Sequence, residues 1–458
     1  MQILITIALI IIGILFFELI IFSHEFGHFI TAKLSGVKVN EFSLGMGPRL
    51  FGFKKGETEY SFRLLPIGGF CAMEGEDEDS PEPRAFNNAK IWKRMIIIIA
   101  GAVMNIILGF ILMFAYTVQA DSYSSTTIAD FTPNSYTANS GLQEGDTIVD
   151  INGYSVWNIR DLQFAIATLK CNEVDPKSVT VYKQDCANSA YDVYSELATE
   201  NELEGEQAEE FYQIVCDGCS KINTADSKES AYKYLEDVCK NLYAYFNIED
   251  FEVSEIEERD KRERFTGDVT VIRDGEEVVL EDVQFFSYYA TQKDKEAEKP
   301  SVAYDFYVEE IEKTVGSVLS QTISETGSMA KTVWTSLVWL VKGEFSFSDL
   351  SGPVGIASAV TQVASQGLET GFTDAVNNIL YVMILITINL GIVNMLPFPA
   401  LDGGRFLFLL IEGIFRKPMP RKFEQIVNVA GLILLMAFMV IISLKDVWQL
   451  ITGTMPKL

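Results

Sequence analysis

Four long apolar segments constrain this chain more than any other feature. They run from about Ile3 to Phe22, Ile91 to Val118, Val376 to Met395 and Ile426 to Ser443. Each is long enough, or nearly so, to cross a hydrocarbon core about 30 Å thick at about 1.5 Å per helical residue. The first does not resemble a cleaved signal peptide, because no Lys or Arg precedes it and no small-residue cleavage site follows it. The sequence therefore predicts a multi-pass α-helical membrane protein with about four transmembrane helices.

Basic residues are concentrated in two of the loops that join these segments. The loop between the first and second segments carries ten Lys and Arg residues, and the loop between the last two carries five. Loops rich in Lys and Arg stay on the cytoplasmic side of a membrane. The sequence therefore predicts a plasma (inner) membrane protein whose two termini and whose long region from Asp121 to about Asp374 are extracytoplasmic.

One segment of the outward region is strongly acidic. Between Cys171 and Phe265 there are 24 acidic and 10 basic residues, which accounts for −14 of the chain's formal charge of −27. Nucleic acids bind to clustered Lys and Arg, and no soluble stretch of this chain provides such a cluster. The composition therefore predicts a lipid bilayer and no nucleic acid as partners, and it gives no indication of the oligomeric state.

Five of the six cysteines lie in the same acidic segment. Such clustering favours disulfides in an oxidising compartment, although five is an odd number and spacing does not determine the connectivity. Cys216 and Cys219 form a C-x-x-C pair, which is also compatible with a redox or metal site. A structural disulfide or an inert thiol is the preferred interpretation.

The sequence Ser23-His-Glu-Phe-Gly-His28 follows the first apolar segment. His24 and His28, the only two histidines of the chain, are one helical turn apart, so both imidazoles can reach one zinc ion. Glu25 is placed to act as general base on a zinc-bound water, whose pKa the metal lowers. Three ionisable groups at the end of a lipid-embedded helix are costly and usually functional. The motif therefore predicts a catalytic zinc centre.

A catalytic zinc ion takes three protein ligands and keeps one open position, so a third ligand is required. Because the chain has no further histidine, this ligand must be a carboxylate or a thiolate. Asp402 is the preferred candidate, since it follows the third apolar segment in a stretch broken by two prolines and two glycines. Broken backbone at membrane depth occurs where it is buried in protein or lines a cavity. A lone Asp-Gly pair would otherwise indicate a turn or a helix cap.

Several ordered motifs resemble those of the site-2 protease family of intramembrane metalloproteases, in particular its bacterial branch with an extracytoplasmic PDZ region. The motifs are H-E-F-G-H at His24 to His28, G-M-G-P at Gly45 to Pro48, P-I-G-G-F at Pro66 to Phe70, M-N-I-I-L-G at Met104 to Gly109, S-G-P-V-G-I-A at Ser351 to Ala357, and N-M-L-P-F-P-A-L-D-G-G at Asn394 to Gly404. The resemblance implies that His24, His28 and Asp402 bind zinc. It also implies that Glu25 is the catalytic base.

The function that this resemblance implies is regulated intramembrane proteolysis of single-pass membrane proteins, such as anti-sigma factors or signal-peptide remnants. Asn394 would hold the substrate or polarise its carbonyl, and Asn389 would contribute similarly. One alternative is a membrane scaffold that binds peptides through its PDZ region and has a vestigial metal site. Another is a metal transporter, which would need ligands for both uptake and release, whereas two neighbouring histidines provide only one site.

Residues Leu50 to Leu64 show the alternation of a β-hairpin with its turn at Lys54-Lys55-Gly56. An open strand edge could pair with a substrate helix that has unwound to expose its peptide bonds. The resemblance also implies a membrane-associated β-region beside the active site, although an ordinary cytoplasmic hairpin fits the pattern equally well. Four glycines are expected to allow close backbone approach: Gly45, Gly47, Gly68 and Gly69.

The run from Pro133 to Gly153 resembles the core of a PDZ domain, and its Asn152-Gly153 pair independently indicates a hairpin turn. The pattern stops after Leu169 and resumes near Asp268, so the acidic segment is interpreted as an insertion. In the family this region restricts access to substrates that have already been trimmed, and an acidic insertion could enlarge such a filter. Residues Ile311 to Leu340 suit a helix on the membrane surface or a helix packed on the outer domain.

These patterns divide the chain into four parts. Residues 1–120 hold the first two transmembrane helices, the zinc motif and the hairpin. Residues 121–300 form an extracytoplasmic PDZ-like α/β domain with the insertion at about 171–265. Residues 301–375 are an amphipathic linking region at the membrane surface. Residues 376–458 hold the last two transmembrane helices and the third zinc ligand.

Overall fold

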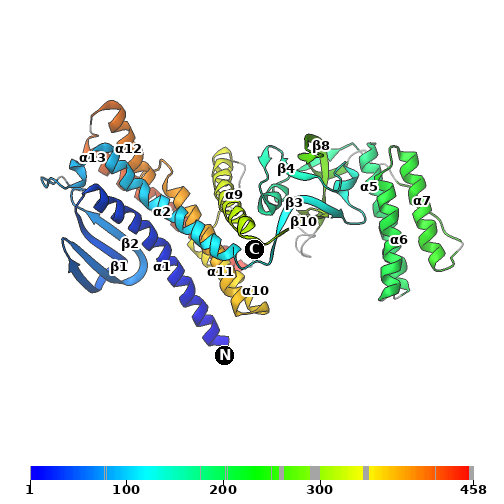
Figure 1. Cartoon of the computed structure of the whole chain (residues 1–458), viewed down its shortest axis with the longest axis horizontal. Coiled ribbons are helices and arrows are strands. Elements are labelled where there is room, and N and C mark those ends of the chain that lie inside the picture. Colours follow the sequence, from blue (N-terminus) through cyan, green and yellow to red (C-terminus); the bar gives the residue numbers. More distant parts are fainter. Residues whose placement is uncertain are drawn as a thin grey trace. The chain divides into compact units, whose positions relative to one another are not determined.

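The computed structural model of the chain contains two compact units (Figure 1). One unit comprises Met1–Ala120 with Val318–Leu458, and the other comprises Asp121–Ser317. The structure describes residues 2–76, 78, 80–175, 177–201, 203, 205–248, 250–256, 262–288, 300–343, 350–417 and 419–452. We call the first the membrane unit and the second the outer unit.

The membrane unit contains four helices that are long and apolar enough to span a bilayer. They lie in α1 (Gln2–Ser35), α2 (Ile91–Thr117), α11 (Phe372–Asn394) and α13 (Arg421–Thr452). The predicted set of four membrane helices is therefore confirmed. The predicted segment Ile3 to Phe22 lies within α1, which continues beyond it to Ser35. The candidate span described in this helix is Ile11–Ser35.

Four further helices belong to the described part of the membrane unit. They are η1 (Phe86–Asn88), α9 (Val315–Lys342), α10 (Pro353–Thr370) and α12 (Asp402–Phe415). The Ser-Gly-Pro motif begins α10, where the first backbone N–H groups of a helix have no intrahelical partner. The buried Asp446 carboxylate of α13 accepts two of them, from Gly352 at 2.9 Å and Gly355 at 2.8 Å. Residues 344–349 of the predicted linking region lie outside the described residues.

A β-hairpin packs against α1 and is longer than predicted. Strands β1 (Val39–Lys55) and β2 (Thr58–Met73) pair from Lys55 and Thr58 at the turn to Val39 and Met73 at the base. Residues 41–44 pair with residues 69–72 on one side and with 59–62 on the other. The hairpin thus folds back on itself, and residues 49–55 and 69–73 form its outer strands.

Glycines permit this folding back. Gly45 has a φ of 78°, and a Cβ there would lie 2.6 Å from the Leu65 carbonyl oxygen. Gly69 likewise leaves room for the Ser43 carbonyl oxygen, which would lie 2.9 Å from an added Cβ. The distal half of the hairpin exposes large apolar side chains, which is unfavourable in water and compatible with a lipid environment: Met46, Leu50, Phe51, Phe53, Phe62, Leu64 and Leu65.

The outer unit is built on an eight-stranded sheet of order β10-β3-β4-β7-β8-β9, with β5 paired to β4 and β6 paired to β7. The strands are β3 (Ser122–Phe131), β4 (Thr147–Ile151), β5 (Tyr154–Ser155), β6 (Cys171–Val174), β7 (Arg262–Arg273), β8 (Glu276–Tyr288), β9 (Ser301–Ala303) and β10 (Phe306–Glu312). The predicted turn at Asn152-Gly153 joins β4 and β5, and both residues have positive φ. Helices α3 (Tyr136–Asn139) and α4 (Ile159–Ala167) accompany the sheet.

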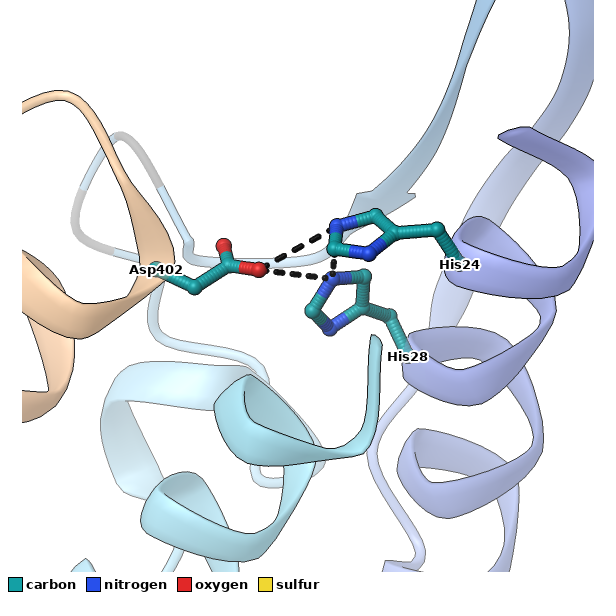
Figure 2. Close-up of side chains that lie close together, drawn as sticks. All are labelled: His24, His28 and Asp402. Atoms are coloured by element: carbon teal, nitrogen blue, oxygen red, sulfur yellow. Dashed lines mark hydrogen bonds and ion pairs between the residues drawn. The ribbon is translucent and has the colours of Figure 1, made fainter. Parts of the chain in front are cut away.

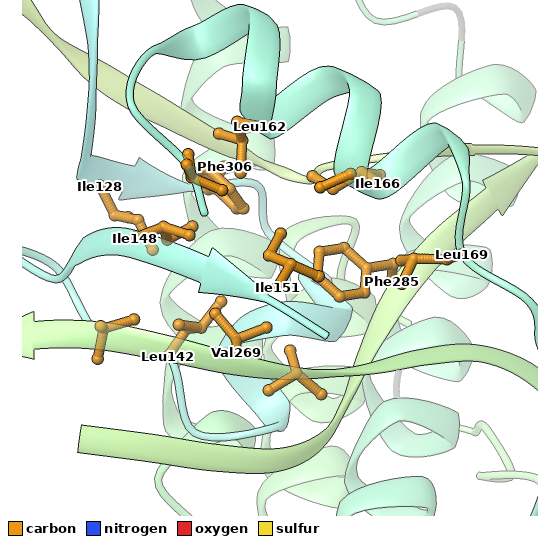
Figure 3. Close-up of a cluster of buried hydrophobic side chains, with 14 residues drawn as sticks. Ile128, Leu142, Ile148, Ile151, Leu162, Ile166, Leu169, Val269, Phe285 and Phe306 are labelled. Carbon is orange, nitrogen blue, oxygen red and sulfur yellow. The ribbon is translucent and has the colours of Figure 1, made fainter. Parts of the chain in front are cut away.

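Apolar side chains from the sheet and from α4 form one core (Figure 3). Fully buried members include Ile128, Ile148, Leu162 and Val269. Asp146 is also fully buried, and its carboxylate accepts two hydrogen bonds from the Arg273 guanidinium, each at 2.7 Å. A buried carboxylate without such a partner would strongly destabilise the folded state.

The acidic segment forms three helices, α5 (Val179–Glu200), α6 (Glu206–Asn223) and α7 (Lys228–Tyr245), around a second core of their own. Cys186, Cys219 and Cys239 are fully buried in this core. No disulfide joins any of the six cysteines in the described chain. Strands β6 and β7 flank these helices, and Cys171 of β6 pairs with Phe265 of β7.

Candidate metal centre and active site

Three side chains from opposite ends of the sequence converge in the membrane unit. His24 and His28 lie one turn apart on α1, and Asp402 is the first residue of α12 (Figure 2). Asp402 Oδ2 lies 3.2 Å from His24 Nε2 and 3.4 Å from His28 Nε2, and the two Nε2 atoms are 3.3 Å apart. The structure therefore brings together the three residues that the sequence predicts as zinc ligands.

Two glycines after Asp402 make its position possible. A Cβ on Gly403 would lie 2.2 Å from the Leu396 carbonyl oxygen, and one on Gly404 would lie 2.3 Å from that of Phe398. The proline-containing loop before Asp402 can therefore fold tightly over the start of α12. This close approach places the Asp402 carboxylate at the end of the loop and beside α1.

The donor set fits a zinc ion. His28 Nδ1 lies 2.8 Å from the Ile97 carbonyl oxygen, which can only accept, so Nδ1 carries the proton and Nε2 presents a lone pair to the cluster. Asp402 Oδ2 is buried and has no hydrogen-bond partner in the described structure. In a tetrahedral site with bonds of about 2.0–2.1 Å, neighbouring ligand atoms are about 3.3 Å apart. The three observed separations match this spacing, and one tetrahedral position remains open.

Glu25 lies beside the cluster and faces a cavity of about 650 Å³. The backbone N–H of Cys71 in β2 lies close to its carboxylate. The three clustered residues line this cavity together with the end of β2, which contributes Phe70, Cys71, Ala72 and Met73. Polar groups of α12 and α13 complete this part of the wall: Arg405, Gln425 and Asn428. The predicted general base and the predicted ligands therefore share one cavity.

Residues 69–73 of the hairpin form the side of the cavity next to Glu25. Among the described residues, this strand pairs along one edge with residues 41–44, and no strand pairs with its other edge. The Cys71 N–H that reaches Glu25 belongs to this second edge. Because N–H and C=O of one strand residue point in the same direction, the Cys71 carbonyl is on the cavity side as well.

Asn389 and Asn394, the predicted substrate-binding residues, are both on α11. Asn389 is exposed, and Asn394 is the half-buried last residue of the helix. Neither is among the described residues that line the cavity around Glu25. Their role in substrate binding stays a prediction.

The structure also shows polar contacts that sequence reasoning did not find. Arg405 of α12 donates to Glu76, which follows β2, at 2.5 Å. Arg94 of α2 donates to Glu412 of α12 at the same distance. These two ion pairs lie in a second cavity of about 370 Å³, which shares Arg405 and Glu76 with the first. The sequence shows that charged residues lie near membrane helices, but their spacing does not indicate which of them form ion pairs.

The profile of peptidase family M50 matches residues 12–438. The chain belongs to peptidase family M50. It is 28% identical to the zinc metalloprotease RasP of Bacillus licheniformis over 519 residues, which cover 95% of this chain and 98% of that protein. The regulator of sigma-W protease RasP of Bacillus subtilis is 25% identical over 95% of this chain and 97% of its own length.

A Clostridium acetobutylicum relative is 31% identical to the M50 protein over 438 residues, which cover 96% of this chain and 97% of the relative. The M50 protein is thus a zinc metalloprotease and an integral membrane protein, as the sequence predicted. The prediction of a site-2 protease is confirmed at the level of the family.

Proposed function

We propose that the M50 protein is an intramembrane endopeptidase that hydrolyses peptide bonds in single-pass membrane proteins. His24, His28 and Asp402 hold the zinc ion, and Glu25 is the general base. The convergence of three ligand atoms at 3.2–3.4 Å, beside a carboxylate and an unpaired strand edge, carries this proposal. These groups lie at the end of a membrane helix, where ionisable side chains are costly unless they serve a function.

The chemistry follows from the positions of these groups. A bound zinc ion would supply Lewis acidity, lowering the pKa of a coordinated water and polarising the scissile carbonyl. Glu25 takes a proton from the attacking water while the water oxygen forms a bond to the carbonyl carbon. Glu25 then gives this proton to the amide nitrogen, whose bond to carbon breaks. The products are a carboxylic acid and an amine, the acid's proton passes to the amine to give a carboxylate and an ammonium group, and Glu25 returns to its starting state.

Substrate binding would use the outer edge of residues 69–73. A transmembrane helix hides its peptide groups in internal hydrogen bonds, so the segment to be cut must first unwind. An extended segment that pairs with the free edge of β2 would regain hydrogen bonds for its exposed backbone. Because the Cys71 N–H contacts Glu25, a segment paired there would lie next to the general base.

The charge distribution of the loops supports an orientation with both termini and the outer unit outside the cell. The helix α1 then runs inward, and the cluster near its end lies toward the cytoplasmic side of the bilayer. The outer unit would act as a PDZ-like filter, enlarged by the three-helix insertion, that admits trimmed substrates. The name of the Bacillus subtilis relative refers to sigma-W, which supports anti-sigma factors as one substrate class, beside signal-peptide remnants.

The test is cleavage of a tagged transmembrane peptide by purified protein in detergent, compared with Glu25→Gln. Both forms should hold one equivalent of zinc, because Glu25 is not among the converging ligands. The parent alone should cut, with the variant slower by a factor of about 100 to 10,000 through loss of the general base. Equal rates in the two forms would exclude Glu25 as the base. Zinc in both forms with no cleavage across a panel of substrates would instead support a scaffold.

A further inference from the structure

One face of α2 lies directly against the two histidines. Three residues of this helix, each one turn from the next, face the histidines: Ile97, Gly101 and Asn105. Ile97 lies by His28, Asn105 lies by His24, and Gly101 lies between them. The Ile97 carbonyl lies 2.8 Å from His28 Nδ1, and the Asn105 amide nitrogen lies 3.5 Å from His24 Nδ1. A Cβ on Gly101, between them, would touch both rings. The two helices are therefore in register, turn against turn.

The proton positions in this arrangement identify a role for Asn105. If His24 Nε2 binds a metal, its lone pair is used there, so the neutral ring carries its proton on Nδ1. That N–H is directed at the Asn105 side chain, which is fully buried. Asn105 Oδ1 has no hydrogen-bond partner in the described structure. Rotating the amide by half a turn exchanges its oxygen and nitrogen and places Oδ1 opposite His24 Nδ1.

We propose that Asn105 is a positioning residue for the zinc centre: its side-chain carbonyl accepts the His24 Nδ1–H and holds His24 with Nε2 toward the metal. This inference rests on the proposed zinc site. Each histidine then donates its Nδ1–H to a carbonyl oxygen: His28 to the backbone of Ile97 and His24 to the side chain of Asn105. Asn105 is itself held from a third helix, because Thr387 of α11 donates to its backbone oxygen at 3.3 Å.

The expected effect follows from the loss of an acceptor in a buried place. Without Asn105 Oδ1, the His24 Nδ1–H has no partner, and the ring gains by moving its proton to Nε2, which then competes with zinc binding. Removing a hydrogen-bond partner of a metal-bound histidine typically lowers metal affinity by about 10- to 100-fold. Asn105→Leu keeps the approximate volume without an acceptor, and Asn105→Asp keeps an acceptor oxygen.

The control lies on the same helix. Thr117 is buried near the far end of α2, and its hydroxyl lies 2.7 Å from that of Thr322. Thr117→Val removes a buried polar group of similar environment at a distance from the histidines. We expect parental zinc affinity for this variant and for Asn105→Asp, and a loss of about 10- to 100-fold for Asn105→Leu, measured by competition with a chromophoric chelator in detergent.

A second measurement reads the proton itself. Because the chain has only two histidines, protein labelled with nitrogen-15 histidine gives only two sets of imidazole signals. The zinc-loaded parent should show His24 with its proton on Nδ1, slow to exchange with solvent. In Asn105→Leu this proton should exchange faster, while the Nδ1 proton of His28, held by Ile97, should be unchanged. A purely structural role for Asn105 would disturb both rings alike.

The outcomes separate this inference from the proposed function. A parent protein that binds no zinc would overturn the proposed function. A parent that binds zinc, beside an Asn105→Leu variant with equal affinity and an unchanged His24 signal, would overturn the role of Asn105 alone. Loss of zinc in Asn105→Leu with retention in Asn105→Asp and Thr117→Val would establish it.

Discussion

Gly101 offers a sharp test of how closely α2 approaches the histidines. A Cβ at this position would lie 2.4 Å from His28 Nε2 and 2.8 Å from His24 Cε1. Non-bonded heavy atoms are comfortable at about 3.5 Å, so Gly101→Ala would require a movement of about 1 Å. Metal sites tolerate changes of about 0.2 Å in ligand distance. We expect zinc affinity to fall by at least about 100-fold, or about 2.8 kcal/mol of binding free energy.

The assay is zinc binding by the purified protein, with chelator competition for affinity and elemental analysis for content. Gly109→Ala is the matched control, because Gly109 is on the same helix and its added Cβ would lie 2.6 Å from Ile388 Cγ1. That substitution crowds a flexible side chain on α11 and leaves the histidines untouched. Zinc binding at parental strength in Gly101→Ala would refute the close contact between α2 and the two rings.

Two further predictions concern ion pairs away from the zinc site. Arg273→Met leaves Asp146 buried without its ion-pair partner and should destabilise the outer unit by about 3–5 kcal/mol. Unchanged hydrogen-exchange protection of residues 121–317 in the full chain would contradict this prediction. Hydrogen bonds from Arg84 and Lys33 hold the pKa of Glu57 at about 2, below its ordinary 4.5. The contribution of Glu57 to hairpin stability is therefore complete above about pH 4.5 and is lost as the pH falls through about 2. If the hairpin amides of Glu57→Gln exchange at the same rates as those of the parent protein across this pH range, the prediction is wrong.

The convergence of His24, His28 and Asp402 and the candidate membrane helices were predictable from short sequence patterns. His24 and His28 need only helical periodicity to share a face, and a missing third histidine directs attention to Asp402. Asn105 was visible only as one polar residue in an apolar segment. Its role depends on the register between α1 and α2, which is set by the packing of Gly101 against both rings. No spacing along one helix encodes that register.

The hairpin shows a different limit. Alternation indicated Leu50 to Leu64, whereas the paired strands extend from Val39 to Met73. Glycines with positive φ interrupt the alternation and let residues 41–44 pair on two sides, so the pattern of a simple two-stranded ribbon is lost there. Among the residues that this extension adds, Phe70 to Met73 line the cavity. Sequence periodicity therefore missed the part of the hairpin closest to the proposed chemistry.

The acidic segment begins and ends at neighbouring positions of one ladder, since Asn172 pairs with Arg264 and Cys171 with Phe265. Partners of this kind are about 5 Å apart, a gap that an ordinary two-residue turn closes. The three-helix bundle can therefore be exchanged for a short loop, or for a foreign domain with neighbouring ends, without changing the register of the sheet. Because the two ends are held side by side, this position can serve as a grafting point for an engineered loop or domain.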